Sequence, residues 1–175
     1  MFRAANCRIG KMAGVSVAVT VLMMTSSFSV ANATGKSGIH LSASDGKFKF
    51  TVTSISCGTK SYSSADGFET ATAQGVFCKV AMTVKNTGKQ QQMLDDSSQY
   101  LYGRGGTQFS ASSQADLYLN SNNMWTLTSL NPGLSISGFI YFDVPRHTNI
   151  GWMVVHDSMF SNGATISLKS LKIKA

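Results

Sequence analysis

The sequence predicts an all-β fold arranged as an antiparallel β-sandwich. Apolar and polar residues alternate in seven or more short runs, and a period of two is typical of strands that bury one face. Turn-forming residues separate these runs, as they do in sandwiches. Downstream of the N-terminal region no stretch shows sustained helical periodicity, so strands are the elements that we expect.

The first 33 residues predict a secretory signal peptide. Three basic residues precede an apolar run at positions 12–24, and residues 31–33 (Ala-Asn-Ala) form the small-x-small pattern that a signal peptidase accepts. The alternative is an uncleaved membrane anchor, but the apolar run is shorter than the roughly 20 residues that a spanning helix needs. We therefore expect cleavage after Ala33, a secreted protein, and no stable membrane anchor after cleavage.

The charge of the mature chain argues against nucleic acid as a partner. Cleavage removes three of the fifteen Lys and Arg residues and none of the eight acidic residues, which leaves a formal charge of +4. The remaining lysines are scattered, whereas nucleic-acid binding needs a concentrated basic face. The 142 residues that remain are enough for an independent hydrophobic core.

Residues 34–46 are small and polar and predict a flexible lead-in, so the sandwich is assigned to residues 47–175. Apolar residues at positions 48, 50 and 52 alternate with polar ones and predict a half-buried strand. The apolar parity then shifts near Ser54, which indicates a bulge or the end of the strand. Residues 58–67 are predicted to form a loop.

The clearest strand is predicted at residues 76–84, where every second residue is apolar, and Asn86-Thr87-Gly88 ends it with turn-forming residues. It places Cys78 on the core face. Because Cys7 leaves with the signal peptide, Cys57 and Cys78 form an even pair in an exported chain, which predicts a disulfide. A metal site is the alternative, but the three histidines have no ligand-like spacing. We expect neither a metal nor another cofactor.

Residues 86–125 are rich in Gln, Ser, Asn and Gly. Within this segment, residues 100–109 predict two short strands around a Gly-rich turn, and Leu117 and Leu119 mark a further short strand. The pair Asp95-Asp96 is expected to lie in a solvated turn, since calcium needs about six to eight oxygen ligands and no loop here has that density.

The segment LNPGLSISGFIYFDVP, residues 130–145, predicts a Pro-Gly turn followed by a strand that Pro145 ends. Gly138 interrupts the apolar face, which indicates a bulge or a close backbone approach. Asp143 is expected on the outward or rim-facing side. Ser135 and Ser137 do not form a hydrolase nucleophile turn, because that motif requires glycine at position 137.

Two more strands complete the predicted sandwich. The first covers residues 150–154, with Ile150, Trp152 and Val154 on one face. The second covers residues 164–173, and its outward lysines are typical of a protected sheet edge.

Four segments in order carry a family resemblance: CKVAMTVKNTG, LDDSSQYLYGRGGTQF, LNPG and GFIYFDVP. Over residues 45–173 the chain resembles a family of bacterial exported domains known as domain of unknown function 4352, similar to a small secreted mycobacterial antigen. The resemblance implies export and an immunoglobulin-like sandwich, and it carries over no catalytic residue. The matching positions are Asn86, Gly88, Asp95, Asp96, Pro132, Gly133, Phe142, Asp143, Val144 and Pro145.

The inventory of reactive residues favours a binding domain over an enzyme. Neighbouring residues of a strand point to opposite faces, so His156 and Asp157 are not expected to form a catalytic dyad. The alternatives are a carrier that holds an apolar ligand between the sheets and an unrecognised hydrolase.

We therefore expect an exported, non-catalytic binding module whose partner is a protein or an envelope component. Recognition in a sandwich most often uses loops, and the longest polar segments are residues 58–75 and 86–125. Tyr100, Tyr102 and Trp125 are the candidate binding residues, because aromatic side chains that are exposed together make a recognition surface.

Overall fold

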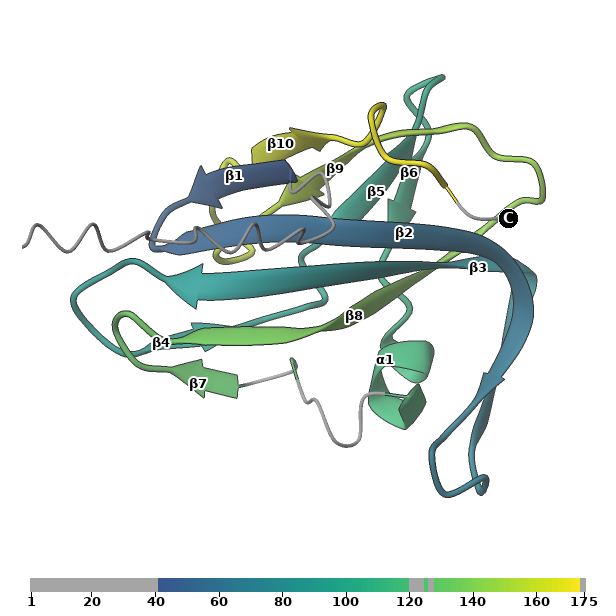
Figure 1. The fold of residues 1–175 in the computed structure, drawn as a ribbon, viewed down its shortest axis with the longest axis horizontal. Coiled ribbons are helices and arrows are strands. Elements are labelled where there is room, and N and C mark those ends of the chain that lie inside the picture. Colours follow the sequence, from purple (N-terminus) through teal and green to yellow (C-terminus); the bar gives the residue numbers. More distant parts are fainter. Residues whose placement is uncertain (1–40, 120–124, 126–127, 174–175) are drawn as a thin grey trace, which may run out of the picture. The chain divides into compact units, whose positions relative to one another are not determined.

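The computed structural model describes residues 41–119, 125 and 128–173, and the predicted signal peptide lies outside them. Two four-stranded antiparallel sheets form a β-sandwich (Figure 1), which confirms the predicted fold class. The long-stranded sheet has the order β1-β2-β3-β8, with β1 (Leu41–Asp45), β2 (Phe48–Ser63), β3 (Thr70–Asn86) and β8 (Ser135–Val144). The short-stranded sheet has the order β10-β9-β5-β6, with β10 (Ala164–Ser167), β9 (Ile150–Val155), β5 (Tyr100–Gly103) and β6 (Gln108–Ser110).

Three further elements complete the described part of the chain. Strands β4 (Gln92–Leu94) and β7 (Thr128–Leu130) pair with each other, and α1 (Ser113–Leu119) is a short helix. Among the described residues, no helix is long and apolar enough to cross a membrane. The strand β1 corrects the prediction of a flexible lead-in through residue 46, since its five residues pair with β2.

The main core lies between the two sheets and follows the alternation of the sequence. Phe50, Val80 and Ile140 of the long-stranded sheet are fully buried, as are Leu101 and Met153 of the short-stranded sheet. Burial of each such side chain contributes about 1.5–3 kcal/mol relative to exposure. The core therefore accounts for the strands that the period-two pattern predicts.

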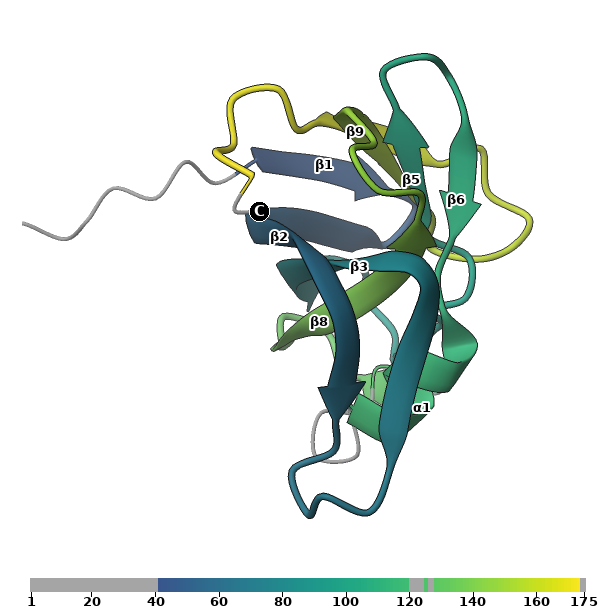
Figure 2. The same cartoon turned by 90° about the vertical axis from the view of Figure 1, so that its right-hand side faces the viewer.

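Strands β2 and β3 form a hairpin that is longer than expected. The register shifts between Val52 and Ser54, which confirms the predicted irregularity as a bulge. Residues 58–63 and 70–75, however, are strands and not part of a loop, and only the residues between them form the turn. Figure 2 shows the hairpin continuing past the sandwich, with α1 beside it.

A second, smaller core forms where this hairpin, α1 and the outer face of the long-stranded sheet meet. Phe77 and Tyr141 are buried there against Ala115 of α1. Lys79 covers the cluster with its ammonium group 3.7 Å from the ring centre of Phe139, and burial lowers the pKa of this lysine. The helix corrects the prediction of a strand at residues 117–119, because a short amphipathic segment that faces a sheet can bury its apolar side as one or two helical turns.

Two predictions about the last strands need correction. In β9, Met153 and Val155 face the core, while Trp152 and Val154 face outward, although Ile150 is buried as expected. Every residue from 150 to 155 is apolar or glycine, so the pattern alone does not reveal which face is buried. Strand β10 lies at a sheet edge as predicted, but it ends at residue 167 instead of 173.

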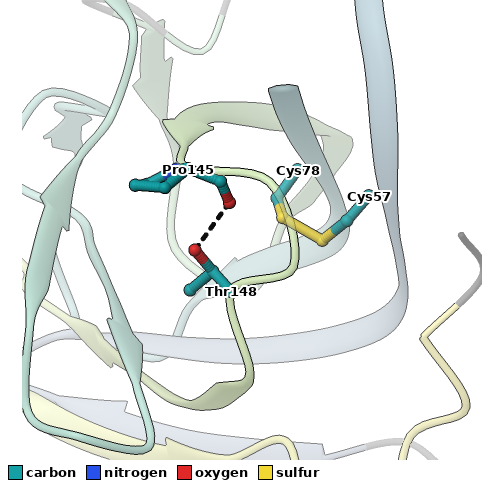
Figure 3. The surroundings of a disulfide bond; sticks show 4 residues. All are labelled: Cys57, Cys78, Pro145 and Thr148. Atoms are coloured by element: carbon teal, nitrogen blue, oxygen red, sulfur yellow. Dashed lines mark hydrogen bonds between the residues drawn. A yellow bond between two sulfur atoms is a disulfide. The ribbon is translucent and has the colours of Figure 1, made fainter. Parts of the chain in front are cut away.

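The predicted disulfide between Cys57 and Cys78 is present (Figure 3). The two cysteines are direct partners on β2 and β3, and their Cα atoms are 4.0 Å apart. The bond therefore links neighbouring strands of one sheet and does not join the two sheets. Cys78 is fully buried, as its position in the strand predicts.

Gly138 in β8 gives room to Trp125, which resolves the two interpretations left open by the sequence. A Cβ atom at position 138 would lie 1.7 Å from Nε1 of Trp125, so the indole occupies the space that a side chain would fill. The close approach involves a distant side chain and not a backbone segment. The turn before this strand forms as predicted, with Gly133 at a φ of 79°.

Candidate functional site

The structure separates the three predicted binding residues. Tyr100 and Tyr102 lie on β5 with their side chains partly exposed on the outer face of the short-stranded sheet. Trp125 is 1% exposed and belongs to the main core, so it is not available to a partner without unfolding. Its assignment as a binding residue is therefore wrong. Although Trp125 lies in a polar segment of the sequence, its large aromatic side chain packs in the main core.

Two other aromatic residues, one on β9 and one just after it, lie against the tyrosines. Tyr102 on β5 is the direct partner of Trp152 on β9, and their rings stack with centres 5.3 Å apart and planes 10° apart. Tyr100 packs edge to face against His156, with ring centres 5.5 Å apart. We call these four side chains, Tyr100, Tyr102, Trp152 and His156, the aromatic face.

Uncharged polar residues flank the aromatic face. Gln108 pairs with Tyr102 on one side and Ser167 pairs with Trp152 on the other, so one row runs across all four strands. The hydroxyl group of Tyr102 donates a hydrogen bond to Oε1 of Gln108 over 2.7 Å. A second row places Ser110 and Thr165 beside Tyr100 and Val154. The outward residues of these four fully described strands carry no permanent charge, which suits a neutral ligand.

A backbone contact fixes the position of His156 at the end of β9. The amide of Gln99, which is buried, accepts a hydrogen bond from the backbone N–H of His156 and donates one to its carbonyl, both over 2.9 Å. Gly163 leaves space for the imidazole, since a Cβ atom there would lie 2.5 Å from its Nε2. Nδ1 of His156 is buried and has no hydrogen-bond partner within the described ranges.

Asp157 points to a different part of the molecule. Its carboxylate accepts a hydrogen bond from the backbone N–H of Lys47 over 3.3 Å, and its own N–H donates to Asp45 over 2.7 Å. Both contacts hold the β1–β2 turn. The side chains of His156 and Asp157 thus serve separate neighbours, as the alternation of a strand predicts.

Asp143 of the FDVP segment supports the scaffold. Its carboxylate accepts hydrogen bonds from the backbone N–H groups of Gln74 (2.6 Å) and Gly75 (2.9 Å). These residues belong to a stretch of β3, residues 73–76, that lies opposite the single residue Lys60 because the register shifts there. The ammonium group of Lys60 donates to three carbonyls of the same stretch. The two charged side chains thereby replace the missing ladder bonds.

Two buried carboxyl groups lie behind the long-stranded sheet. Asp116 of α1 is 3% exposed, and its Oδ1 accepts a hydrogen bond from the backbone N–H of Tyr141 over 3.1 Å. Burial, together with the charge of Asp96, raises the pKa of Asp116 to about 8. Asp96 is itself buried, which corrects the prediction of a solvated turn, whereas the partly exposed Asp95 binds Ser97 and Ser98 in the expected turn.

Within the part of the chain that the structure describes, no three His, Cys, Asp or Glu side chains lie close enough together to hold a metal ion. The sequence pattern placed Trp152 on the same face as Ile150, so it was not predicted as a surface residue, and the pattern did not predict that His156 would lie against Tyr100. Trp152 and His156 share the parity of Val154 in the sequence, but an entirely apolar strand gives no sign of which parity faces the solvent.

Solved structures with similar folds come from several bacteria. The chain is similar to a secreted protein from Mycobacterium tuberculosis, MPT63, with 18% identity, a TM-score of 0.50, and coverage of 73% of this chain and 91% of that one. It is also similar to a putative lipoprotein from Bacillus subtilis, with 20% identity and a TM-score of 0.51. That match covers 75% of this chain and 40% of the Bacillus chain. At these identities the likeness shows a common fold.

No curated protein resembles the chain closely enough to count as a relative. The family comparison is more informative, because its match spans residues 37–165 and so covers most of the chain, from β1 to the start of β10, including the disulfide. This chain belongs to the family described as domain of unknown function DUF4352.

Proposed function

We propose that this protein is an exported, non-catalytic binding module that recognises a component of the cell envelope, or a protein presented there, through its aromatic face. The observation that carries the proposal is an outward surface where the register of β5 and β9 stacks Tyr102 on Trp152, and where His156, just after β9, packs against Tyr100. Aromatic side chains with a polar edge are enriched at recognition surfaces, because they bury much area at little cost in conformational entropy.

The chemistry of the face favours a neutral partner. The face and its flanking residues offer the tyrosine hydroxyls, the indole N–H of Trp152, the imidazole of His156, and the hydroxyl and amide groups beside them. Uncharged groups of this kind form hydrogen bonds without the desolvation cost of a permanent charge. Ring faces and edges supply apolar contact beside them. A neutral glycan strand, with alternating apolar ring faces and hydroxyl groups, matches this arrangement better than an acidic polymer does.

Export is supported by sequence features and by two related folds. The first 33 residues have the basic, apolar and small-residue regions of a secretory signal peptide. One similar structure is described as a secreted protein and another as a putative lipoprotein. Cleavage after Ala33 follows from the same pattern, and N-terminal sequencing of the protein recovered from the medium tests it.

The separation of His156 from Asp157 supports a non-catalytic role. General acid–base catalysis needs two groups positioned on the same reacting centre. The histidine packs on Tyr100, whereas the aspartate binds the backbone of Lys47. Asp116, whose pKa is raised to about 8, is buried.

The test compares binding by the purified protein to isolated cell-wall glycan and to an envelope protein fraction. The double variant Tyr102→Ala/Trp152→Ala should lose at least tenfold in affinity, because truncation of a central aromatic anchor commonly costs about 2 kcal/mol or more. Phe68→Ala is the matched control, since Phe68 is an 88% exposed aromatic residue at the tip of the β2–β3 hairpin. Circular dichroism verifies that each variant remains folded.

Full binding by the folded double variant would overturn the assignment of the aromatic face. Turnover of a substrate by the purified protein, abolished by His156→Ala without unfolding, would overturn the non-catalytic role. Selective binding to the protein fraction instead of the glycan would support the aromatic face as the binding surface, and would show that its partner is a protein and not a neutral glycan.

A further inference from the structure

A cavity of about 270 Å³ opens at the end of the sandwich, where the chain crosses from β8 to β9 beside the disulfide. We call it the end cavity. Figure 3 shows the disulfide next to the turn that contains Pro145 and Thr148. Residues of this turn, Cys57 and Ile173 line the cavity. It is separate from the aromatic face, and the inference drawn from it does not rest on the proposed function.

The floor of the end cavity is apolar. Val76 and Val144 are direct partners on β3 and β8, and both are buried members of the main core that reach its edge here. Ile173 lines the cavity as well, although 37% of its surface is exposed. Covering this partly exposed side chain with an apolar group is favourable, because it removes apolar surface from water.

The rim of the end cavity carries the positive charge of Arg146. Arg146 and His147 occupy the turn between the two sheets and line the opening, and no Asp or Glu is among the described lining residues. The turn is closed by Thr148, whose hydroxyl group donates to the carbonyl of Pro145 over 2.6 Å (Figure 3). His147 adopts a left-handed φ of 63°, which is uncommon for a residue with a Cβ. Such backbone conformations persist only where the surrounding structure holds them in place, and they cluster at active sites and ligand-binding segments.

We infer that the end cavity binds a small amphipathic carboxylate, with its aliphatic chain against Val76, Val144 and Ile173 and its carboxylate at the rim beside Arg146. A guanidinium group is always charged and matches a carboxylate in geometry. The volume lies just below the roughly 300–1,000 Å³ of typical small-molecule sites, which suits a short chain. The site differs from a carrier cavity between the sheets, because the ligand lies at their end and its charged group stays at the surface.

The test titrates the purified, isotope-labelled protein with sodium octanoate and follows its amide resonances by NMR. Octanoate should cause saturable shifts that centre on residues 57–58, 76 and 144–148. Octylammonium, which has the same chain and the opposite charge, should bind at least fivefold more weakly. Acetate, which has the carboxylate without the chain, should cause no saturable shift.

Arg146→Gln should weaken octanoate binding by roughly tenfold, the loss of one charge-assisted hydrogen bond. Arg104→Gln is the matched control, because Arg104 is an exposed arginine in the β5–β6 turn and does not line the cavity. Equal binding of octanoate and octylammonium would overturn the inference, as would equal effects of the two variants or shifts spread evenly over the surface. An Ile173→Ser variant tests the floor without altering the core, and unchanged affinity there would also contradict the site.

Discussion

Replacement of Asp143 by alanine should destabilise the fold by about 2–4 kcal/mol, although this aspartate lies partly exposed at the edge of a sheet. Its carboxylate accepts hydrogen bonds from the N–H groups of Gln74 and Gly75, at 2.6 and 2.9 Å. Both groups lie where β3 loses its register with β2, so the ladder offers them no partner. The alanine variant leaves two backbone donors without an acceptor on the protein.

The magnitude follows from the number and type of these bonds. A hydrogen bond to a charged group contributes roughly 1.5–3 kcal/mol, so two such bonds set an upper limit of about 6 kcal/mol. Water reaches a partly exposed site and recovers part of the loss, which gives about 2–4 kcal/mol for Asp143→Ala. Asp143→Asn keeps one acceptor oxygen without the charge, and we expect it to lose about half as much.

The assay is urea denaturation of the purified protein with the disulfide intact. Asp66→Ala is the control, because Asp66 likewise accepts a backbone N–H, that of Phe68, but lies in the exposed hairpin turn. It should leave the free energy of unfolding close to that of the parent. Hydrogen exchange should also accelerate at residues 61–63 and 70–72 of the Asp143→Ala variant, beyond the irregular stretch. A loss below about 0.5 kcal/mol, a typical effect of a surface substitution, would refute the scaffolding role of this carboxylate.

Two further predictions concern buried groups. Because the folded protein holds the pKa of Asp116 at about 8, above the ordinary 3.8, the folded state binds more protons than the unfolded state between these pH values. The free energy of unfolding should therefore fall as pH rises through this window, by up to about 1.4 kcal/mol per pH unit. Urea denaturation at pH 5 and 8 should show that Asp116→Asn reduces this dependence of the unfolding free energy on pH. The same dependence in the parent and the variant would contradict the prediction. Gly138→Ala should destabilise the fold by about 1–3 kcal/mol and shift tryptophan fluorescence to the red, because the new methyl group would lie 1.7 Å from Nε1 of Trp125. A melting temperature and a spectrum like those of the parent would show that the indole can move without loss of stability.

The strands that bury one face and expose the other could be predicted from the sequence. Lys, Thr and Ser alternate with apolar residues in the first half of β2 and along β3, so water and core select opposite sides of each strand. The same parity places Cys78 in the core and makes its pairing with Cys57 expected. The Pro132-Gly133 turn follows from local backbone preferences alone.

The length of the β2–β3 hairpin depends on tertiary contacts. Its outer half is rich in Ser and Thr, which is the composition of a loop, and it becomes a strand because Tyr62 and Ala71 pack in the second core with α1. The helix forms for the same reason, since seven residues are too few to be stable as an isolated helix. Neither element has a strong local signal, because each is stabilised by the other.

The sequence by itself determined the fold class, the disulfide, the Pro132-Gly133 turn and the approximate positions of several strands, because these depend on the alternation of neighbouring residues and on local backbone preferences. Only the tertiary structure decided which side of β9 faces the solvent, since all its residues are apolar or glycine. Pairing with β5 settled that choice by placing Met153 against Leu101 in the core, which left Trp152 to stack on Tyr102 outside. The burial of Trp125 also depends on the tertiary structure, because the space above Gly138 exists only once β8 has joined its sheet.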